Sequence, residues 1–126
     1  MGKLMKTLLQ LEEFALCALG ILFFSTLGYS WWTFWGLLLT PDIGMLGYLI
    51  NSKVGAASYN LFHHRGMAIA VGLIGYTASI PLLTLAGTIL FTHAAMDRML
   101  GYGLKYTDNF AHTHLGMIGR TNAERG

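Results

Sequence analysis

Charged side chains are scarce in this chain. Its 126 residues include eight Lys and Arg and six Asp and Glu, so that charged residues make up 11% of the sequence. A soluble globular domain carries roughly 25% charged residues, and so few charges cannot cover the surface of a soluble protein of this length. Apolar residues make up 54%, and the mean hydropathy is +0.52. These values indicate an integral membrane protein with a single domain.

The same counts exclude several classes of protein. The formal net charge of +2 is too small for the basic surface that binds nucleic acid. The single cysteine, Cys17, excludes an internal disulfide framework and a cysteine-rich zinc or iron–sulfur site. We therefore expect the lipid bilayer as a partner, and no nucleic acid.

Four apolar segments approach the roughly 20 residues that a membrane-spanning helix needs. They cover residues 14–30, 32–50, 54–75 and 80–100. Pro41 interrupts the second segment near its middle, because proline removes a backbone hydrogen bond. The sequence therefore predicts an all-α domain over residues 1–126, built as a bundle of four transmembrane helices. Residues 101–126 are too polar to span, and we expect them to form a short amphipathic tail.

The basic residues predict the orientation of this bundle. If the N-terminus is cytoplasmic, every Lys and Arg except Arg65 lies on the cytoplasmic side. The two outer turns, near Ser30 and Thr77, carry no charge. Because cytoplasmic loops of membrane proteins are enriched in Lys and Arg, we expect a multi-pass protein with both termini, and the tail, on the cytoplasmic side.

Several ionisable residues fall inside the predicted spans, where they are costly and usually functional. At 1.5 Å of rise per helical residue, Asp42, His63 and His93 lie roughly 10–15 Å from the cytoplasmic ends of their helices. Asp97 lies closer to the surface and shares a helix face with His93, four residues before it. Because three helices carry polar groups at similar depth, we expect these four side chains to meet in the bundle.

Two interpretations of this polar layer stay open. Imidazole and carboxylate groups suit zinc, iron or manganese, so the layer is a candidate divalent metal site formed by Asp42, His63, His93 and Asp97. Alternatively, the same groups form hydrogen bonds between helices that fix their packing. Arg65 needs an acidic partner near the midplane, and pairing with Asp42 would remove one ligand from the metal site.

Neighbouring residues extend the set of candidates. Tyr59 and Asn60 lie one helical turn before His63 and His64. His64 points about 100° away from His63 around a helix, so we expect it to face a neighbouring helix or a partner.

Several short motifs resemble those of a known family. They are Pro41-Asp42, Tyr59-Asn60 with His63, His93 with Asp97-Arg98, Gly101 to Tyr106, and Thr113 to Gly116. On these motifs, residues 11–119 resemble a bacterial integral-membrane family known only as domain of unknown function 4260. The resemblance implies a small helical protein of the bacterial inner membrane, without an assigned activity. The positions that match are Asp42, Asn60, His63, His93, Asp97, Lys105, Tyr106 and His114, whereas His64 and Arg65 depart from the family pattern.

Three functions are compatible with these residues. The first is a metal centre that supports lipid-directed hydrolysis, with Lys105, Tyr106 and His114 lining a cytoplasmic mouth for a phosphate or carboxylate headgroup. The second is a non-catalytic accessory or assembly subunit that contacts a protein partner in the membrane or a second copy of itself; in a variant of this hypothesis, one histidine ligates a haem or chlorophyll-type pigment. The third is a proton or solute pathway, which is disfavoured because the polar groups are confined to the cytoplasmic half.

Overall fold

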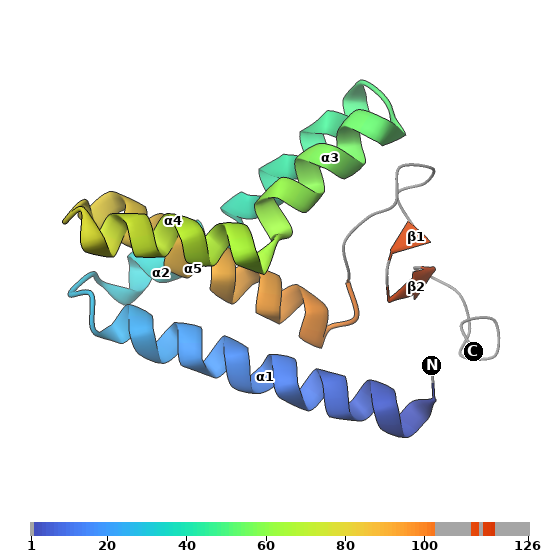
Figure 1. Cartoon of the computed structure of the whole chain (residues 1–126), viewed down its shortest axis with the longest axis horizontal. Coiled ribbons are helices and arrows are strands. Elements are labelled where there is room, and N and C mark those ends of the chain that lie inside the picture. Colours follow the sequence, from blue (N-terminus) through green and yellow to red (C-terminus); the bar gives the residue numbers. More distant parts are fainter. Residues whose placement is uncertain (1, 103–111, 114, 118–126) are drawn as a thin grey trace.

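The computed structural model of the chain describes residues 2–102, 112–113 and 115–117 (Figure 1). These residues are almost entirely helical, which confirms the all-α class. The elements are α1 (Lys3–Ser25), α2 (Trp31–Leu37), the 3₁₀ helix η1 (Thr40–Leu49), α3 (Ser52–His63), α4 (Arg65–Thr77) and α5 (Pro81–Met99). In the tail, the two-residue strands β1 (His112–Thr113) and β2 (Gly116–Met117) pair antiparallel, with His112 opposite Met117.

Helix α5 is the centre of the arrangement. Both α1 and α4 pack along it, whereas α3 packs mainly against η1. The α3–η1 pair projects away from the other helices at a steep angle (Figure 1). The fold is therefore a layer of α1, α5 and α4 with a helical arm, which the chain enters after α2 and leaves into α4.

Two of the predicted spans are broken helices. The predicted span 32–50 contains α2, then η1, with Pro41 in the first turn of η1. The prediction of an uninterrupted helix over 54–75 is wrong, because His64 has an extended backbone (φ −84°, ψ 117°) between α3 and α4. The exposed His64 side chain caps α4, since its Nδ1 accepts a hydrogen bond from the Met67 amide at 3.1 Å. The predicted span 80–100 agrees with α5 within one residue at each end.

Only one of the described helices is long and apolar enough to cross a membrane by itself. That helix is α1, which begins well before the predicted residue 14. Few of its residues are buried inside the protein, so most of its apolar surface faces outward. The predicted spans 32–50 and 54–75 are each divided into two shorter helices, and none of these helices is long enough to cross a membrane by itself.

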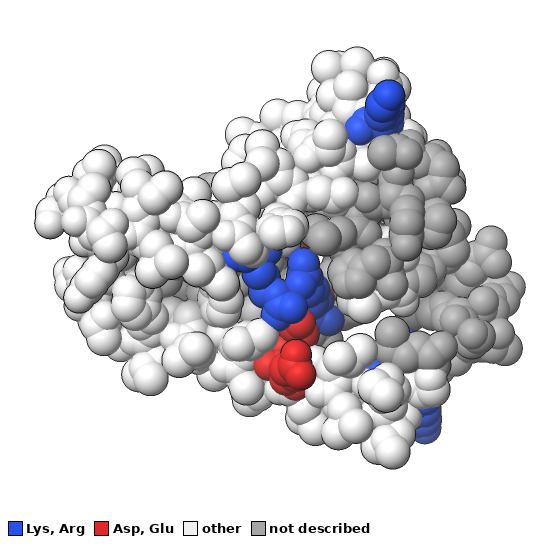
Figure 2. All heavy atoms as spheres, viewed as in Figure 1, with Lys and Arg blue, Asp and Glu red and all other residues white. Residues whose placement is uncertain are grey.

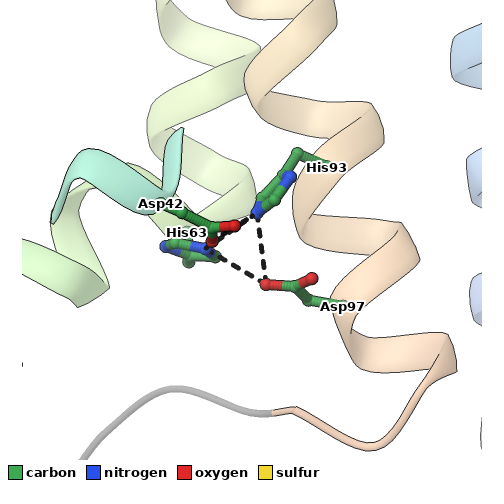
Figure 3. Close-up of side chains that lie close together, drawn as sticks. All are labelled: Asp42, His63, His93 and Asp97. Atoms are coloured by element: carbon green, nitrogen blue, oxygen red, sulfur yellow. Dashed lines mark hydrogen bonds and ion pairs between the residues drawn. The ribbon is translucent and has the colours of Figure 1, made fainter. Parts of the chain in front are cut away.

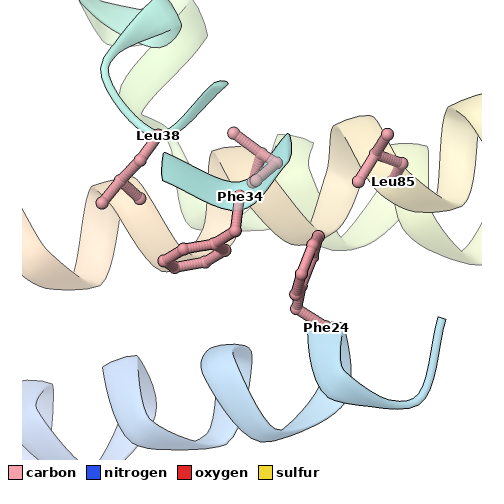
Figure 4. Packing of buried hydrophobic residues seen from close by; sticks show 5 residues of the cluster. Phe24, Phe34, Leu38 and Leu85 are labelled. Atoms are coloured by element: carbon pink, nitrogen blue, oxygen red, sulfur yellow. The ribbon is translucent and has the colours of Figure 1, made fainter. Parts of the chain in front are cut away.

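Small residues bring the helix backbones close together, and a compact apolar cluster fixes one end of the layer. A Cβ atom added to Gly87 of α5 would lie 2.4 Å from the backbone nitrogen of Gly72 in α4. Such close approach is typical of helix pairs in membranes. The cluster joins α1, α2 and α5 (Figure 4) and consists of Phe24, Phe34, Leu38, Leu85 and Ile89.

Candidate metal centre

The helix interruptions place the four predicted ligands around one point. Asp42 lies in the first turn of η1, and His63 is the last residue of α3. His93 and Asp97 lie four residues apart on α5. One ligand atom from each of the four residues lies within 4.8 Å of the other three (Figure 3). The expectation that these side chains meet is therefore correct.

The distances between the ligand atoms are short and nearly uniform. The two histidine Nε2 atoms are 3.0 Å apart. The Oδ2 atom of Asp97 lies 3.1 Å from the Nε2 atom of His63 and 3.2 Å from that of His93. The Oδ1 atom of Asp42 lies 3.3 Å and 3.0 Å from the same two nitrogens. The four ligand atoms therefore surround a space of the size that one small ion would fill.

Backbone carbonyl groups fix both imidazole rings. The Nδ1 atom of His93 donates to the carbonyl oxygen of Leu38 at 2.6 Å, and that of His63 donates to the carbonyl oxygen of Tyr59 at 2.9 Å. Leu38 directly follows α2, where helix carbonyl groups lack partners within the helix. Each Nε2 atom faces the other ring and two carboxylates. Either protons on Nε2 or a cation between the four atoms therefore holds these groups together.

Three of these candidate ligands are largely buried, and the fourth is partly exposed to solvent. The side chain of His93 is 0% exposed, that of His63 4% and that of Asp97 14%. The side chain of Asp42 is 38% exposed. Water therefore reaches the group from the side of Asp42, whereas the histidine side is closed by protein.

Tyr59 supports the buried side of the group. Its ring stacks on the imidazole of His63, with centroids 3.8 Å apart and an interplanar angle of 10°. Its hydroxyl group donates to Oδ2 of Asp97 at 3.5 Å. Tyr59 thus contacts two of the candidate ligands and is suited to position them.

The partner of Arg65 differs from the prediction. Its Nη1 atom forms an ion pair with Oε2 of Glu13 in α1 at 2.6 Å, and not with Asp42. The Asp42 carboxylate is therefore available to the histidines. The spacing of Glu13, Gly20 and Phe24 is a usable sequence signal for this partner, because all three occupy one buried face of α1.

The remaining candidates lie outside this group. Asn60 is partly buried on α3 and contributes no ligand atom to the group of four. His64 is exposed and acts as a helix cap. Lys105, Tyr106 and His114 lie outside the described residues, so their proposed place at a cytoplasmic mouth stays a prediction.

Comparison with protein families gives one match. The sequence profile of a domain of unknown function, DUF4260, matches residues 6–118. The chain belongs to this family. All four candidate ligands of the DUF4260 chain, together with Tyr59 and Arg65, fall inside the matched region. No curated protein and no solved structure matches the chain.

Proposed function

We propose that the protein binds one divalent transition-metal ion through Asp42, His63, His93 and Asp97, and that this centre hydrolyses a bond in a membrane-resident substrate. The observation that carries the proposal is the convergence of two Nε2 atoms and two carboxylate oxygens from three segments of the chain. Each imidazole also donates a hydrogen bond from Nδ1 to a backbone carbonyl oxygen, which is the usual support of a metal-bound histidine.

The spacing of the ligand atoms fits a small metal ion. Zinc bonds of about 2.0 Å in a tetrahedron require ligand atoms about 3.3 Å apart. The five nitrogen–nitrogen and nitrogen–oxygen distances in the group range from 3.0 to 3.3 Å. Two imidazoles and two carboxylates suit zinc, iron or manganese.

Differences in burial support a catalytic use of this centre. Catalytic zinc sites have three protein ligands and a position for water. His63, His93 and Asp97 form a buried triangle, with Nε2 and Oδ2 atoms 3.0–3.2 Å apart. Asp42, the fourth and most exposed ligand, lies at the edge that water reaches, so it is the ligand that an entering water molecule would displace, and its carboxylate is then suited to accept a proton from that water. A metal ion bound here would lower the pKa of that water molecule and polarise the bond to be cleaved.

The membrane arrangement is part of the proposal. We place the protein in a bacterial inner membrane with four crossings and cytoplasmic termini, in which α2 with η1 and α3 with α4 cross as broken helices. Broken helices in membranes are tolerated where they line a site, and their free backbone groups serve that site. In support, the interruptions lie beside Asp42 and His63, and the carbonyl group of Leu38 at the first break binds His93.

A second candidate is a non-catalytic subunit stabilised by a structural metal. Four protein ligands are typical of structural zinc sites, which favours this alternative. In that case the exposed apolar faces would meet a protein partner or a second copy of the chain. Axial ligation of a haem fits poorly, because both Nε2 atoms face each other in a buried space that is too small for a macrocycle.

Metal content tests the proposal directly. Protein purified in detergent would be analysed by elemental mass spectrometry, with His93→Asn and Asp97→Asn as site variants. His64→Asn is the matched control, because asparagine preserves the cap of α4. We expect about one zinc, iron or manganese ion per chain in the wild type and the control. We expect its loss in both site variants, with gel filtration confirming that they fold.

The catalytic part is tested separately with Asp42→Asn. If the centre is hydrolytic, this variant retains metal with reduced affinity and loses hydrolysis of fluorogenic phospholipids in vesicles. Wild-type protein that takes up none of the three metals after loading would contradict the whole proposal. Equal metal content without hydrolysis in the wild type would favour the structural subunit.

A further inference from the structure

An apolar groove runs along the helical layer, outside the candidate metal centre. Helices α1 and α4 form its sides and α5 its floor, and its volume is about 510 Å³. Its sides include Leu19, Phe23, Ile69 and Leu73, and Gly87 lies in its floor. No charged side chain lines it. A groove of this kind on a membrane protein is suited to a hydrocarbon chain.

Charged residues gather at one end of this groove. Arg65 lies one helical turn before Ile69 on α4, and Glu13 lies two turns before Gly20 on the same face of α1. Arg98 shares a face of α5 with Phe91, seven residues before it. Figure 2 shows basic and acidic side chains side by side near the centre of the face in view, with other basic side chains toward its edge. The ion pair of Arg65 with Glu13 belongs to this group.

Arg98 is the unusual member of the group. It is partly buried and lies within electrostatic range of Arg65, Glu13 and Tyr59. Within the part of the chain that the structure describes, its guanidinium group has no hydrogen bond or ion pair. Since Glu13 pairs with Arg65, it leaves Arg98 without an ion pair among the described residues. A partly buried guanidinium group is stabilised by an anion, which it binds in a bidentate manner.

We propose that the groove binds an acyl chain of an anionic lipid whose phosphate group lies against Arg98 and Arg65, next to the metal centre. This inference rests on the proposed function in one respect, because it makes the bound lipid the substrate of the hydrolytic centre. Arg98 lies within electrostatic range of Tyr59, whose hydroxyl group bonds to the candidate ligand Asp97, so the headgroup site and the metal site lie on adjacent faces of α5. A divalent ion neutralises the two carboxylates, which leaves the arginines to attract the headgroup.

Charge complementarity favours a lipid over a second copy of the chain. A transmembrane helix docked in the groove would place an apolar or backbone surface against the guanidinium group of Arg98, which has no ion pair among the described residues, and this is costly in a membrane. An anionic lipid satisfies both parts of the site, because its chain occupies the apolar groove and its phosphate pairs with the arginine.

Native mass spectrometry of the full chain in detergent measures lipid binding without reference to activity. Phosphatidylglycerol and phosphatidylcholine with identical acyl chains would be compared, with glycerol phosphate as a headgroup without a chain. Arg98→Gln removes the charge, and Lys53→Gln is its control at an exposed position in α3. Leu73→Trp narrows the groove, and Leu82→Trp is its control, since Leu82 is 72% exposed and lies outside the groove. Metal content would be measured on the same samples.

We expect phosphatidylglycerol to bind about tenfold more tightly than phosphatidylcholine, which is the factor for one charge-assisted hydrogen bond. Arg98→Gln should abolish this preference, and Leu73→Trp should weaken the binding of both lipids, while the two control variants bind lipid as the wild type does. Equal binding of both lipids, competition by glycerol phosphate alone, or chain dimers that Leu73→Trp disrupts would each overturn the inference. Selective lipid binding by metal-free wild type would instead refute only the metal centre, and metal without lipid binding would refute only this inference.

Discussion

The ion pair between Glu13 and Arg65 joins α1 to α4, and breaking it should measurably destabilise the fold. The side chain of Glu13 is 9% exposed and that of Arg65 is 25% exposed, with 2.6 Å between the paired atoms. Removing one partner of a fully buried pair costs about 3–5 kcal/mol, because the other charge stays buried and unpaired. Since Arg65 is partly hydrated, we expect Glu13→Ala to lower the free energy of unfolding by about 2–3 kcal/mol.

A double-mutant cycle separates the pair from other effects of the substitutions. Glu13→Ala, Arg65→Ala and the double variant would be unfolded in detergent by titration with a denaturant. The fluorescence of Trp31, Trp32 and Trp35 reports on the loss of structure. We expect the double variant to be little less stable than either single variant, since it leaves no unpaired charge, and a coupling energy of about 1–3 kcal/mol.

Two results would refute this reasoning. One is a cost below about 0.5 kcal/mol for Glu13→Ala, which is typical of a solvated surface pair. The other is strict additivity of the two single variants, which would mean that the side chains act independently. Glu12→Ala is the matched control, because Glu12 is exposed, and it should leave stability unchanged.

Three other predictions follow from the site and the packing. Metal occupancy should fall as the pH drops below about 6, because protons compete for imidazole nitrogens whose usual pKa is about 6.5; dialysis at graded pH followed by elemental analysis checks this, and constant occupancy down to pH 4 would argue against histidine ligands. Gly87→Val should destabilise the protein by more than about 2 kcal/mol, because its Cβ would meet the α4 backbone, whereas Gly36→Val, where a Cβ meets nothing within 4 Å, should cost much less in the same unfolding titration. His64→Ala should cost about 1 kcal/mol through loss of the α4 cap, and His64→Asn should restore most of it; equal stability of the two variants would show that the cap contributes nothing.

Much of the candidate centre could be predicted from the sequence, because it depends on the spacing of residues within single helices. The spacing of His93 and Asp97 fixes a shared helix face, and counting residues from the predicted helix ends puts Asp42 and His63 at a similar depth. These are consequences of helix geometry and need no knowledge of tertiary contacts. The supporting hydrogen bond from His93 to the Leu38 carbonyl group was not predictable, because it depends on where α2 ends in space.

The remaining errors came from interactions between distant segments. The break between α3 and α4 was missed because histidine is not among the usual capping residues, so its sequence gives no helix-start signal. The partner of Arg65 was assigned by depth alone, and depth cannot distinguish Asp42 from Glu13 without knowing which helices are neighbours. Helix adjacency is decided by packing at positions such as Gly72 and Gly87, whose pairing one sequence does not specify.

The candidate centre also has a consequence for how the chain is assembled. It joins residues that are 21, 30 and 51 positions apart, and it connects the α3–η1 arm to α5 at a single point. An ion bound there acts as a cross-link that closes several loops at once, so part of its binding energy becomes folding energy. Metal supply during synthesis would then govern the rigidity of the arm, and metal-starved cells would accumulate chains in which the arm is undocked and sensitive to proteases.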